Sequence, residues 1–363
     1  MWLISVYAPD MFKVRVRPKR LILVGSIIVD ILLYIDKFPS RGSDIMVHHN
    51  LVATGGGFNV LSAASRLNMK VAYAGRVGGG IFGQKVAQDL DDMSIPLLLE
   101  PEKTSDNILD TGFDIAIVEK GKLGDGLKGD GVGQRTFITA PGIESCLSTK
   151  DLDGLNLYFK DAIYISGYEL TYPVSGSSIT SWLYLLDDDK LLVVDTGPLL
   201  TEIPIERLDS MLARVDILSM NLTEAALLFE RYYGKDLSED IGGGGDGNVE
   251  IEKLAVSLCK MVKKTSLVVV RTGANGCVLA QDGIGTLHIP GRQTVAVDTT
   301  GAGDVHTGAL LARLSAGDDP TTAARIANIA AGMAVEKKGP SSSPSWAELE
   351  AVLVGEKRTS WKI

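Results

Sequence analysis

The chain has 363 residues, of which 45% are hydrophobic and 22% are charged, a composition typical of a folded protein and not of a disordered or fibrous one. Its 45 acidic residues outnumber 36 basic residues, and the net charge of −9 would repel phosphate backbones and anionic lipid, so we expect no nucleic-acid partner and no membrane partner. No stretch reaches the ~18 apolar residues of a membrane span. The length allows two domains, or one large α/β domain with a smaller appendage.

Residues 1–20 show no clear periodicity and are interpreted as an N-terminal extension. Basic residues in this segment precede the apolar run Leu21–Val29, which loosely resembles a signal peptide. The run is short, Asp30 follows it, and no small-residue cleavage site comes after it, so the pattern predicts a buried first strand instead.

From there to about residue 355, short apolar runs alternate with longer helical stretches. The runs are apolar on both faces, as buried parallel strands of βαβ units are, so we predict an α/β fold with a doubly wound, mostly parallel sheet flanked by helices. Further strands are expected at Val71–Ala74, Ala162–Ile165, Leu191–Val194, Ile217–Met220 and Leu267–Val270. Helices are expected at Val60–Leu67, Gly83–Met93, Thr223–Tyr233, Glu250–Lys264, Gly303–Ser315 and Pro320–Lys337, the last one capped by Asp319.

Two stretches, Ser43–Val52 and Asn107–Thr139, do not alternate with helices and predict a small antiparallel β sheet appended to the main domain. The glycine-rich segment Gly121–Gly133 inside the second stretch is interpreted as a long hairpin loop. A second glycine tract, Gly242–Gly247, is interpreted as a surface loop. Residues 356–363 are interpreted as a C-terminal tail.

The cysteines and histidines exclude several kinds of site. Cys146, Cys259 and Cys277 are widely spaced and form no Cys-x-x-Cys pair, which argues against a disulfide framework and a structural zinc site. A cytoplasmic protein fits this pattern. The four histidines form no His-Glu-x-x-His motif, so a metalloprotease is not supported.

The most specific motif is Asp298-Thr299-Thr300-Gly301-Ala302-Gly303-Asp304, which runs directly into a predicted helix. Small residues before a helix leave backbone amides free, and the helix dipole adds partial positive charge, so the motif predicts an anion hole that suits a phosphoryl group. Asp304 lies at the start of the helix, where a carboxylate can accept a proton from an attacking hydroxyl. From the residues alone, an ordinary helix cap after a glycine-rich turn is equally possible.

Two weaker motifs also precede helices. Gly55-Gly56-Gly57-Phe58-Asn59 permits close approach of a polyhydroxyl ligand to the backbone, although an ordinary loop and N-cap have the same sequence. Asn221-Leu222-Thr223-Glu224 offers an amide and a carboxylate at the end of a strand, where Glu224 could position Mg²⁺ through water. Simple capping of the helix by Asn221 or Thr223 is the alternative.

Gly78-Gly79-Gly80-Ile81-Phe82-Gly83 matches Gly-x-Gly-x-x-Gly between a strand and a helix, so an NAD-dependent oxidoreductase is an alternative hypothesis. The motif does not lie in the first βα turn, and the acidic residues at the appropriate distance fall in an irregular stretch. The chain contains no Gly-x-x-x-x-Gly-Lys-Ser/Thr motif, so a kinase with this sequence would hold ATP without a P-loop.

Asp298–Asp304 resembles the C-terminal signature of the ribokinase or PfkB family of carbohydrate kinases, and Gly56–Asn59 resembles its N-terminal signature. Between them, Gly78–Gly83 resembles the family's Gly-x-Asp-x-x-Gly loop, Asn221–Glu224 its Asn-x-x-Glu motif, and Arg271–Gly276 its Thr-x-Gly-x-x-Gly nucleotide loop. The five motifs occur in family order over residues 21–353. Gly133–Phe137 and Ile165–Tyr168 more weakly resemble the YegV-like sugar kinase subgroup.

This resemblance implies a ribokinase-like domain over residues 21–355, with a small β lid from about 43–52 and 107–139, and an ATP-dependent kinase that phosphorylates a sugar or nucleoside. It implies that Asp304 is the general base and that the amides of Gly301, Ala302 and Gly303 form the anion hole. Sugar contacts are implied for Asp30, Gly57 and Asn59, and a nucleotide site for Asn221, Glu224, Thr272, Gly273, Gly276 and Asn328. Mg²⁺ would be held by Glu224 through water, and the main chain near Asp298 and Thr300 would hold K⁺, as in many family members. The chain would form a dimer by pairing its lid with that of a second copy.

Three positions depart from the family pattern. Gly80 stands where the family often has aspartate, Arg271 replaces the usual threonine, and His306 takes a position that is often aromatic. The acceptor stays open between a fructose phosphate, a pentose, a keto-deoxy acid and a nucleoside. A catalytically weak sugar-binding or regulatory protein with the same fold is the alternative function.

Overall fold

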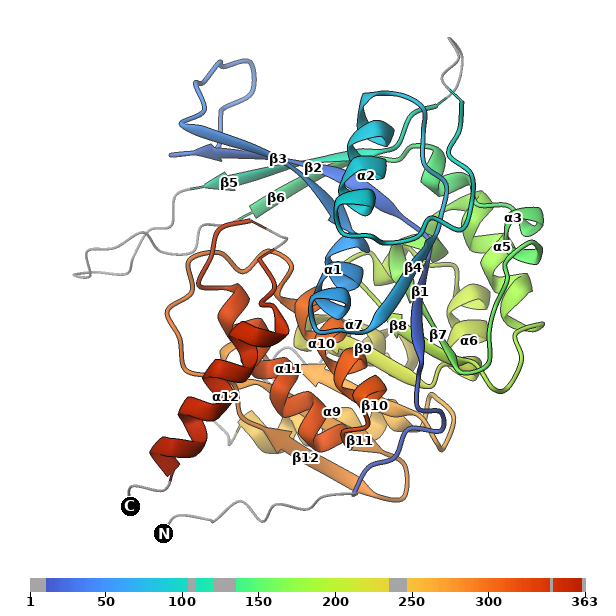
Figure 1. Ribbon diagram of the computed structural model, residues 1–363, viewed down its shortest axis with the longest axis vertical. Helices are drawn as coiled ribbons and strands as arrows, with labels where there is room; N and C mark the ends of the chain where they lie inside the picture. Colours follow the sequence, from blue (N-terminus) through green and yellow to red (C-terminus); the bar gives the residue numbers. More distant parts are fainter. Residues whose placement is uncertain (1–10, 104–108, 120–134, 235–246, 340–341, 361–363) are drawn as a thin grey trace.

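The computed structural model describes residues 11–103, 109–119, 135–234, 247–339 and 342–360. Within these ranges a main α/β domain carries a smaller second sheet, which lies above it in Figure 1. The predicted loop Gly121–Gly133 and most of the tract Gly242–Gly247 fall outside the described residues.

The main sheet has eight strands in the order β12-β11-β10-β9-β8-β7-β1-β4. Its strands are β1 (Arg20–Val24), β4 (Lys70–Ala74), β7 (Asp161–Ser166), β8 (Leu191–Asp195), β9 (Ile217–Asn221), β10 (Leu267–Arg271), β11 (Cys277–Gln281) and β12 (Gly285–Ile289). The six strands from β4 to β10 pair in parallel, which confirms the predicted doubly wound sheet. β11 and β12 are additional to the predicted strands and extend one edge as an antiparallel hairpin.

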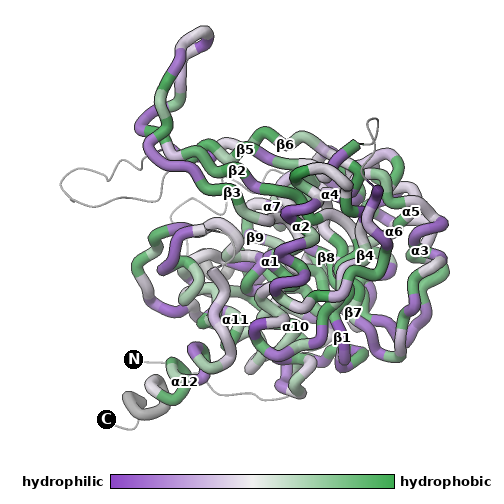
Figure 2. Tube along the Cα trace, turned by 45° about the horizontal axis from the view of Figure 1, so that its top comes forward, coloured by the Kyte–Doolittle hydropathy of each residue, from purple (hydrophilic) through white to green (hydrophobic). Residues whose placement is uncertain are grey.

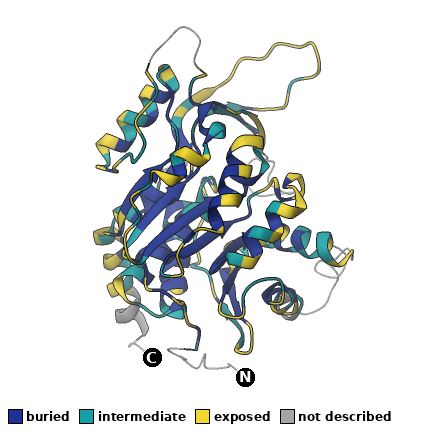
Figure 3. Ribbon diagram, turned by 90° about the vertical axis from the view of Figure 1, so that its right-hand side faces the viewer, coloured by how far each residue is buried: buried dark blue, intermediate teal, exposed yellow. Residues whose placement is uncertain are grey.

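Helices cover both faces of this sheet, and the sheet separates two hydrophobic cores (Figure 3). One face is covered by α1 (Phe58–Arg66), α2 (Ile81–Asp92), α10 (Ala302–Ala316), α11 (Pro320–Ala334) and α12 (Trp346–Ser360). The other is covered by α3 (Thr149–Asp153), α4 (Gly167–Thr171), α5 (Pro173–Leu183), α6 (Ile205–Arg214), α7 (Leu222–Tyr233) and α9 (Gly247–Cys259). Strand β1 contributes side chains to both cores, because Leu21 and Leu23 face one core and Ile22 and Val24 face the other. Among the helices of the described ranges, none combines the length and the apolar content needed to cross a bilayer.

Helix α11 begins as predicted. The Asp319 side chain accepts hydrogen bonds from the amides of Thr321 and Thr322, and a proline occupies the first turn. The helix ends at Ala334, before the expected Lys337. The carbonyl of Val335 instead accepts hydrogen bonds from the amides of residues 297 and 298, so the end of α11 holds the start of the Asp298–Asp304 loop.

The second sheet, here the lid sheet, has the order β3-β2-β5-β6. Its strands are β2 (Ile27–Ile35), β3 (His49–Gly56), β5 (Phe113–Glu119) and β6 (Arg135–Ala140). The β2–β3 and β5–β6 pairs are antiparallel, whereas β2 and β5 are parallel. Both predicted lid stretches contribute strands, and the exposed loop between β2 and β3 extends away from the body of the protein (Figure 2).

The apolar run Leu21–Val29 is not one strand, contrary to our prediction. β1 ends within it, the chain bends at Gly25, and β2 continues in the lid sheet. Gly25 has φ +140°, a conformation that favours glycine, and the backbone amide and hydroxyl of Ser26 donate to the Glu169 carboxylate at 2.7 and 2.9 Å. Hydropathy does not reveal the bend, because both halves are apolar. The consequence is that Asp30 lies in the lid sheet.

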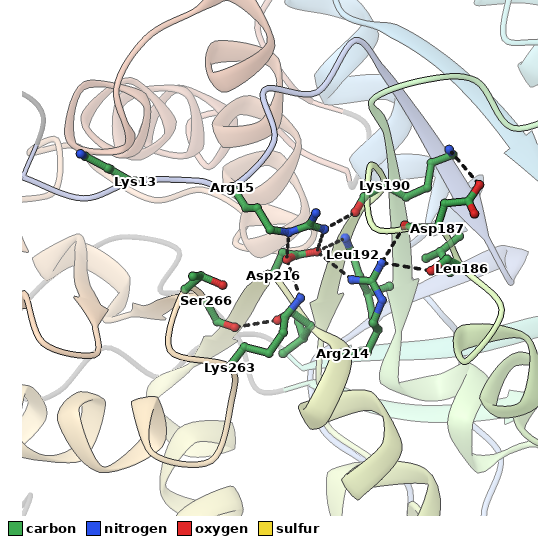
Figure 4. A network of polar contacts seen from close by, with 12 residues as sticks. Lys13, Arg15, Leu186, Asp187, Lys190, Leu192, Arg214, Asp216, Lys263 and Ser266 are labelled. Atoms are coloured by element: carbon green, nitrogen blue, oxygen red, sulfur yellow. Dashed lines mark hydrogen bonds and ion pairs between the residues drawn. The ribbon is translucent and has the colours of Figure 1, made fainter.

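Residues 11–20, assigned above to an extension, pack against the main domain. Phe12 is buried, and the Arg15 Nε lies 3.1 Å from Oδ1 of Asp216, which also accepts a hydrogen bond from Lys263 at 2.6 Å (Figure 4). Burial would raise the pKa of Asp216, but the hydrogen bonds from Arg15 and Lys263 outweigh it and hold the pKa below its usual value. The ionised carboxylate therefore stabilises the fold at neutral pH, and this contribution is lost as the pH falls through the lowered pKa.

Candidate active site

Two cavities lie on either side of the Asp298–Asp304 loop, beyond the C-terminal ends of the parallel strands, where open α/β sheets bind ligands. The first, about 250 Å³, is bounded by the lid sheet and is called the lid cavity. The second, about 350 Å³, is bounded by α11 and is called the α11 cavity. Thr300, Gly301 and Asp304 face the lid cavity, whereas Thr299, Ala302 and Gly303 face the α11 cavity.

The loop leads into α10 in the way the motif predicts. Gly301 is the N-cap with φ +73°, a left-handed conformation that favours glycine, and no side chain caps the helix. A Cβ atom at Gly303 would lie 3.3 Å from the Arg271 guanidinium, so the loop packs directly on that cation. The first amides of α10 therefore lie at the junction of the two cavities, beside a fixed positive charge.

Asp304 is held by a residue of the N-terminal motif. Its Oδ2 accepts a hydrogen bond from the Asn59 amide at 3.2 Å. Burial, followed by the charge of Asp195, raises the pKa of Asp304 to about 7, against the lowering effect of Asn59 and Arg271. A carboxylate with this pKa can accept a proton near neutral pH.

The three residues predicted to contact a sugar, Asp30, Gly57 and Asn59, all line the lid cavity. The glycines of the motif leave room for neighbouring groups. A Cβ atom at Gly55 would lie 2.0 Å from the Asp30 carboxylate, and one at Gly57 would lie 2.5 Å from Leu23. The Asp30 carboxylate therefore lies directly against the backbone of β3, in space that a side chain at Gly55 would fill.

Arg271, one of the three departures from the family pattern, is the centre of a buried polar cluster. Its Nη1 lies 2.6 Å from Oδ2 of Asp195 and 2.5 Å from the hydroxyl of Ser219, and its Nη2 lies 3.7 Å from Oε2 of Glu224. Burial, followed by the charge of Asp195, raises the pKa of Glu224 to about 7. Arg271 lines both cavities and is their shared cation.

The Asn221–Glu224 segment forms the capping box that was the alternative to a site role. The Asn221 side chain accepts from the Glu224 amide at 2.9 Å, and the Glu224 carboxylate accepts from the Asn221 amide at 2.8 Å. Both side chains also border the cavities, Asn221 the α11 cavity and Glu224 the lid cavity. Capping and a site role are therefore compatible.

The α11 cavity collects most residues of the predicted nucleotide site. Gly273, Gly276 and Asn328 line it, whereas Thr272 is not among the described residues around it and closes the loop through an amide hydrogen bond to the Gly276 carbonyl at 2.8 Å. The Asn328 amide donates to the carbonyl of Ile289 at 3.0 Å and thereby braces the backbone that leads into the cavity wall.

The third departure, His306, also lines the α11 cavity. Burial, followed by Arg271, lowers the pKa of His306 to about 3, so the ring is neutral. Both ring nitrogens are buried, and an interaction with the Asn328 side chain partly offsets the lowering of the pKa. His306 is thus a buried, neutral helix histidine at the cavity wall.

The first departure, Gly80, is compensated by a carboxylate from the segment that precedes β5. The Asp110 carboxylate accepts hydrogen bonds from the amides of Gly80, Phe82 and Gly83 at 3.0, 3.0 and 3.1 Å, and so caps α2. A Cβ atom at Gly80 would lie 2.3 Å from Oδ2 of Asp110, which leaves no room for aspartate there. A carboxylate thus fills the place that a dinucleotide pyrophosphate would need, so the Gly-x-Gly-x-x-Gly match does not support NAD binding.

Asp110→Ala should lower the free energy of unfolding by about 1–3 kcal/mol, because the amides of Gly80, Phe82, Gly83 and Thr111 lose their acceptor. Urea unfolding of the variant and of Asp91→Ala, an exposed carboxylate near the other end of α2, measures the difference. Equal stability of the two variants would show that Asp110 is not the brace of this loop.

Asp298 already has a cationic partner. Its Oδ1 lies 2.5 Å from Nη2 of Arg135, on lid strand β6, and accepts from the Thr300 amide at 2.9 Å, while Oδ2 accepts from the Gly339 amide at 3.0 Å. Burial would raise the pKa of Asp298, but the bonds from Thr300 and Gly339 hold it below its usual value. A monovalent cation here would find this carboxylate engaged by a guanidinium, so the Asp298 side chain does not fit a K⁺ ligand.

Several cavity residues were not among the predicted site residues. Asp195 is the last residue of the buried parallel strand β8, and a polar residue at that end is a usable sequence signal. Asp114 and Tyr168 in the lid cavity, and Arg292 in the α11 cavity, come from a lid strand, a short helix and an irregular segment. Only the folded arrangement brings them to the site.

Comparison with known proteins agrees with this geometry. The sequence pattern of the pfkB family carbohydrate kinases matches residues 126–347, more than half of the chain. Over 332 residues the chain is 28% identical to the uncharacterized sugar kinase YegV of Escherichia coli (strain K12), covering 90% of this chain and 92% of that protein.

Solved structures show the same fold. The chain superposes on the ribokinase of Thermotoga maritima with a TM-score of 0.71 at 22% identity, covering 92% of this chain and 98% of that one. It superposes on Arabidopsis thaliana ribokinase complexed with ribose and ATP with a TM-score of 0.68 at 22% identity, covering 93% and 99%. The predicted ribokinase-like fold is confirmed, and the chain belongs to the pfkB family of carbohydrate kinases.

Proposed function

We propose that this sugar kinase transfers the γ-phosphoryl group of ATP to a hydroxyl, most simply a primary one, of a sugar held in the lid cavity. The observation that carries the proposal is the position of the Asp298–Asp304 loop between two cavities, with Asp304 facing one and Gly303 facing the other. A loop in this position can act on both reactants of a single transfer. Family membership supports kinase activity on a sugar.

In this proposal Asp304 is the general base. Its raised pKa and its place in the lid cavity suit a carboxylate that accepts the hydroxyl proton as the oxygen attacks phosphorus. Asn59 holds the carboxylate in position through its hydrogen bond to Oδ2. Asp30, Gly57 and Asn59, which line the lid cavity, bind acceptor hydroxyls.

The amides of Gly301, Ala302 and Gly303 stabilise charge on the transferring phosphoryl group, and Arg271 lies close enough to add positive charge from behind the loop. Mg²⁺ supplies charge neutralisation of the phosphates when bound. In the described residues no group of three or more acidic, histidine or cysteine side chains is arranged to hold a metal ion. We propose that phosphate oxygens hold the ion and that Glu224 reaches it through water.

The α11 cavity is the proposed ATP site. Gly273, Gly276, Asn221 and Asn328 line it, and its wall meets the anion hole at Gly303. The similar Arabidopsis ribokinase structure contains ribose and ATP, which supports a nucleotide and a sugar as the two ligands of this fold.

We further propose that the lid is an interface for a second copy of the chain. Apolar side chains are exposed on both faces of the lid sheet: Val52 and Ile138 project from one face, exposed by 48% and 55%, and Phe137 projects from the other, exposed by 51%. Covering such side chains stabilises association.

The three cysteines are unpaired, which supports placement in the reducing cytoplasm.

K⁺ should change turnover little when it replaces choline as the added cation. Arg135 already neutralises Asp298, so the positive charge that a monovalent ion would supply is present in the protein. Initial rates in the two salts at equal ionic strength measure this. Arg135→Met should become responsive to K⁺, and strong K⁺ activation of the wild type would contradict the assignment.

The proposed function is tested by ADP release from Mg·ATP with a panel of sugars, sugar phosphates and nucleosides. One acceptor should stimulate release. A protein that is stabilised by a sugar yet transfers phosphate to none of the panel would favour the alternative of a sugar-binding or regulatory protein. A nucleoside as the best acceptor would keep the kinase and change the acceptor class.

A further inference from the structure

Asp30 has a carboxylate neighbour in the lid sheet. Asp114 of β5 lies directly opposite Asp30 of β2 in the parallel register, so the two side chains project from the same face. Both line the lid cavity, and Thr139 of β6 continues the row on the far side of Asp114. The lid therefore presents two adjacent carboxylates to the acceptor.

Neither carboxylate is satisfied by the protein. In the described ranges no side chain or amide donates a hydrogen bond to Asp30 or Asp114, and Oδ1 of Asp114 is fully buried without a partner. Asp30 is only 8% exposed. Burial raises the pKa of Asp114 to about 6, and burial followed by the charge of Asp114 raises the pKa of Asp30. Buried acceptors without donors are costly, so their donors are expected from the ligand.

The charged side chains around these two residues are almost all acidic. Six carboxylate side chains line the lid cavity, namely Asp30, Asp114, Glu169, Asp195, Glu224 and Asp304. Arg271 is the one cation among the described lining residues, and it is engaged by Asp195 and Ser219 at 2.6 and 2.5 Å. A phosphate or carboxylate on the acceptor would meet two carboxylates and no free cation in the described lining, whereas hydroxyl groups would supply the missing donors.

Resting on the kinase function above, we propose that Asp114 is a second acceptor-binding residue, and that the Asp30–Asp114 pair restricts the acceptor to polyhydroxyl compounds without an acid group. Sugar hydroxyls donate hydrogen bonds to the two carboxylates. Sugar phosphates and keto-deoxy acids, which the sequence leaves open, are rejected by charge.

Binding to the wild-type chain tests the acceptor class without catalysis. The probes are ribose, fructose, glucose and ribitol, each measured beside its terminal phosphate ester and the corresponding sugar acid, by calorimetry or thermal shift in the absence of nucleotide. We expect the tightest ligand to be neutral and its charged counterparts to bind at least roughly tenfold more weakly. The proposal is overturned when the tightest ligand carries an acid group, or when no neutral probe binds better than its charged counterparts.

Asp114→Asn tests the role of the residue. The variant should bind the neutral ligand roughly ten- to hundredfold more weakly, which is the contribution of a hydrogen bond to a charged group. The ratio of its affinities for the neutral ligand and the charged counterparts should also become smaller. Asp44→Asn, an exposed carboxylate in the β2–β3 loop, is the matched control. If Asp114 has a purely structural role, the variant will bind neutral and charged ligands more weakly by the same factor, and the ratio of the two affinities will not change. That result would overturn the assignment of Asp114 as an acceptor-binding residue.

The two proposals fail in different ways. If neutral sugars bind selectively and are never phosphorylated, the kinase assignment fails while the acceptor class stands. If a sugar phosphate or sugar acid is phosphorylated efficiently, the kinase assignment stands and the acceptor class fails. Unchanged nucleotide affinity of Asp114→Asn shows that the variant is folded.

Discussion

Replacement of Asp304 with asparagine is expected to lower turnover by at least roughly 10²- to 10⁴-fold, because an amide cannot accept the proton of the attacking hydroxyl. Asparagine keeps the size of the side chain, so ligand binding should persist. Steady-state rates of the variant are compared with those of Asp188→Asn, an exposed carboxylate of the main domain. A near-normal rate in Asp304→Asn would contradict the role of this residue as base.

The pH dependence follows from the same carboxyl group. The pKa of Asp304 is raised to about 7, so the base becomes protonated and the rate falls as the pH drops below about 7. In the folded protein this raised pKa also means that ionisation is unfavourable. Stability is therefore lost as the pH rises from the usual aspartate pKa through 7.

Asp304→Asn removes that ionisation, so at pH 8 we expect the variant to unfold at the same or a higher temperature than the wild type. The difference should shrink at pH 4, where the wild-type carboxyl is protonated. Thermal unfolding of both proteins at the two pH values measures the sign of the difference in unfolding temperature. A variant that is less stable at pH 8 would show that the ionised carboxylate is well accommodated.

Arg271→Met is expected to lower the free energy of unfolding by about 3–5 kcal/mol, the cost of leaving buried charges without their partner. Asp195 lies 2.6 Å from the guanidinium and Glu224 lies 3.7 Å from it. Their negative charge would also remain beside the proposed anion hole, so phosphoryl transfer should fall sharply. Chemical unfolding and initial rates measure the two effects separately.

Two further variants separate charge from packing. Arg271→Lys keeps the positive charge and should recover part of the stability, but lysine cannot reproduce the forked contacts to Asp195 and Glu224. Arg66→Met, at a half-exposed arginine 3.8 Å from a surface glutamate, is the matched control and should change stability little. Equal losses of stability in Arg271→Met and Arg66→Met would contradict the role of Arg271 as the centre of the buried polar cluster.

The parts of the fold that sequence analysis predicts are those encoded locally. The parallel strands are continuous apolar runs, and Asp319 with Pro320 predicts the start of α11. The helix start after the Asp298–Asp304 loop is also predictable, because glycines and small residues precede an apolar run, and α10 begins there at Ala302. These features depend on neighbours within a few residues.

The remaining features depend on contacts between distant segments. Asp110 takes the place of an aspartate at Gly80 only because the segment before β5 lies against the start of α2. Arg135 neutralises Asp298 across more than 160 residues, and Asp114 meets Asp30 through strand pairing. The bend at Gly25 follows from the buried partner Glu169. Hydropathy and motif spacing contain none of this information.

Transfer of a labelled γ-phosphoryl group from ATP to the acceptor tests the central claim, that the Asp298–Asp304 loop carries phosphoryl transfer between the two cavities. The acceptor is recovered and its label is compared with the ADP formed, for the wild type and for Asp304→Asn. We expect label on an acceptor hydroxyl in equal amount to ADP, and almost none with the variant. Label found only in inorganic phosphate, or equal transfer by the variant, would contradict the account.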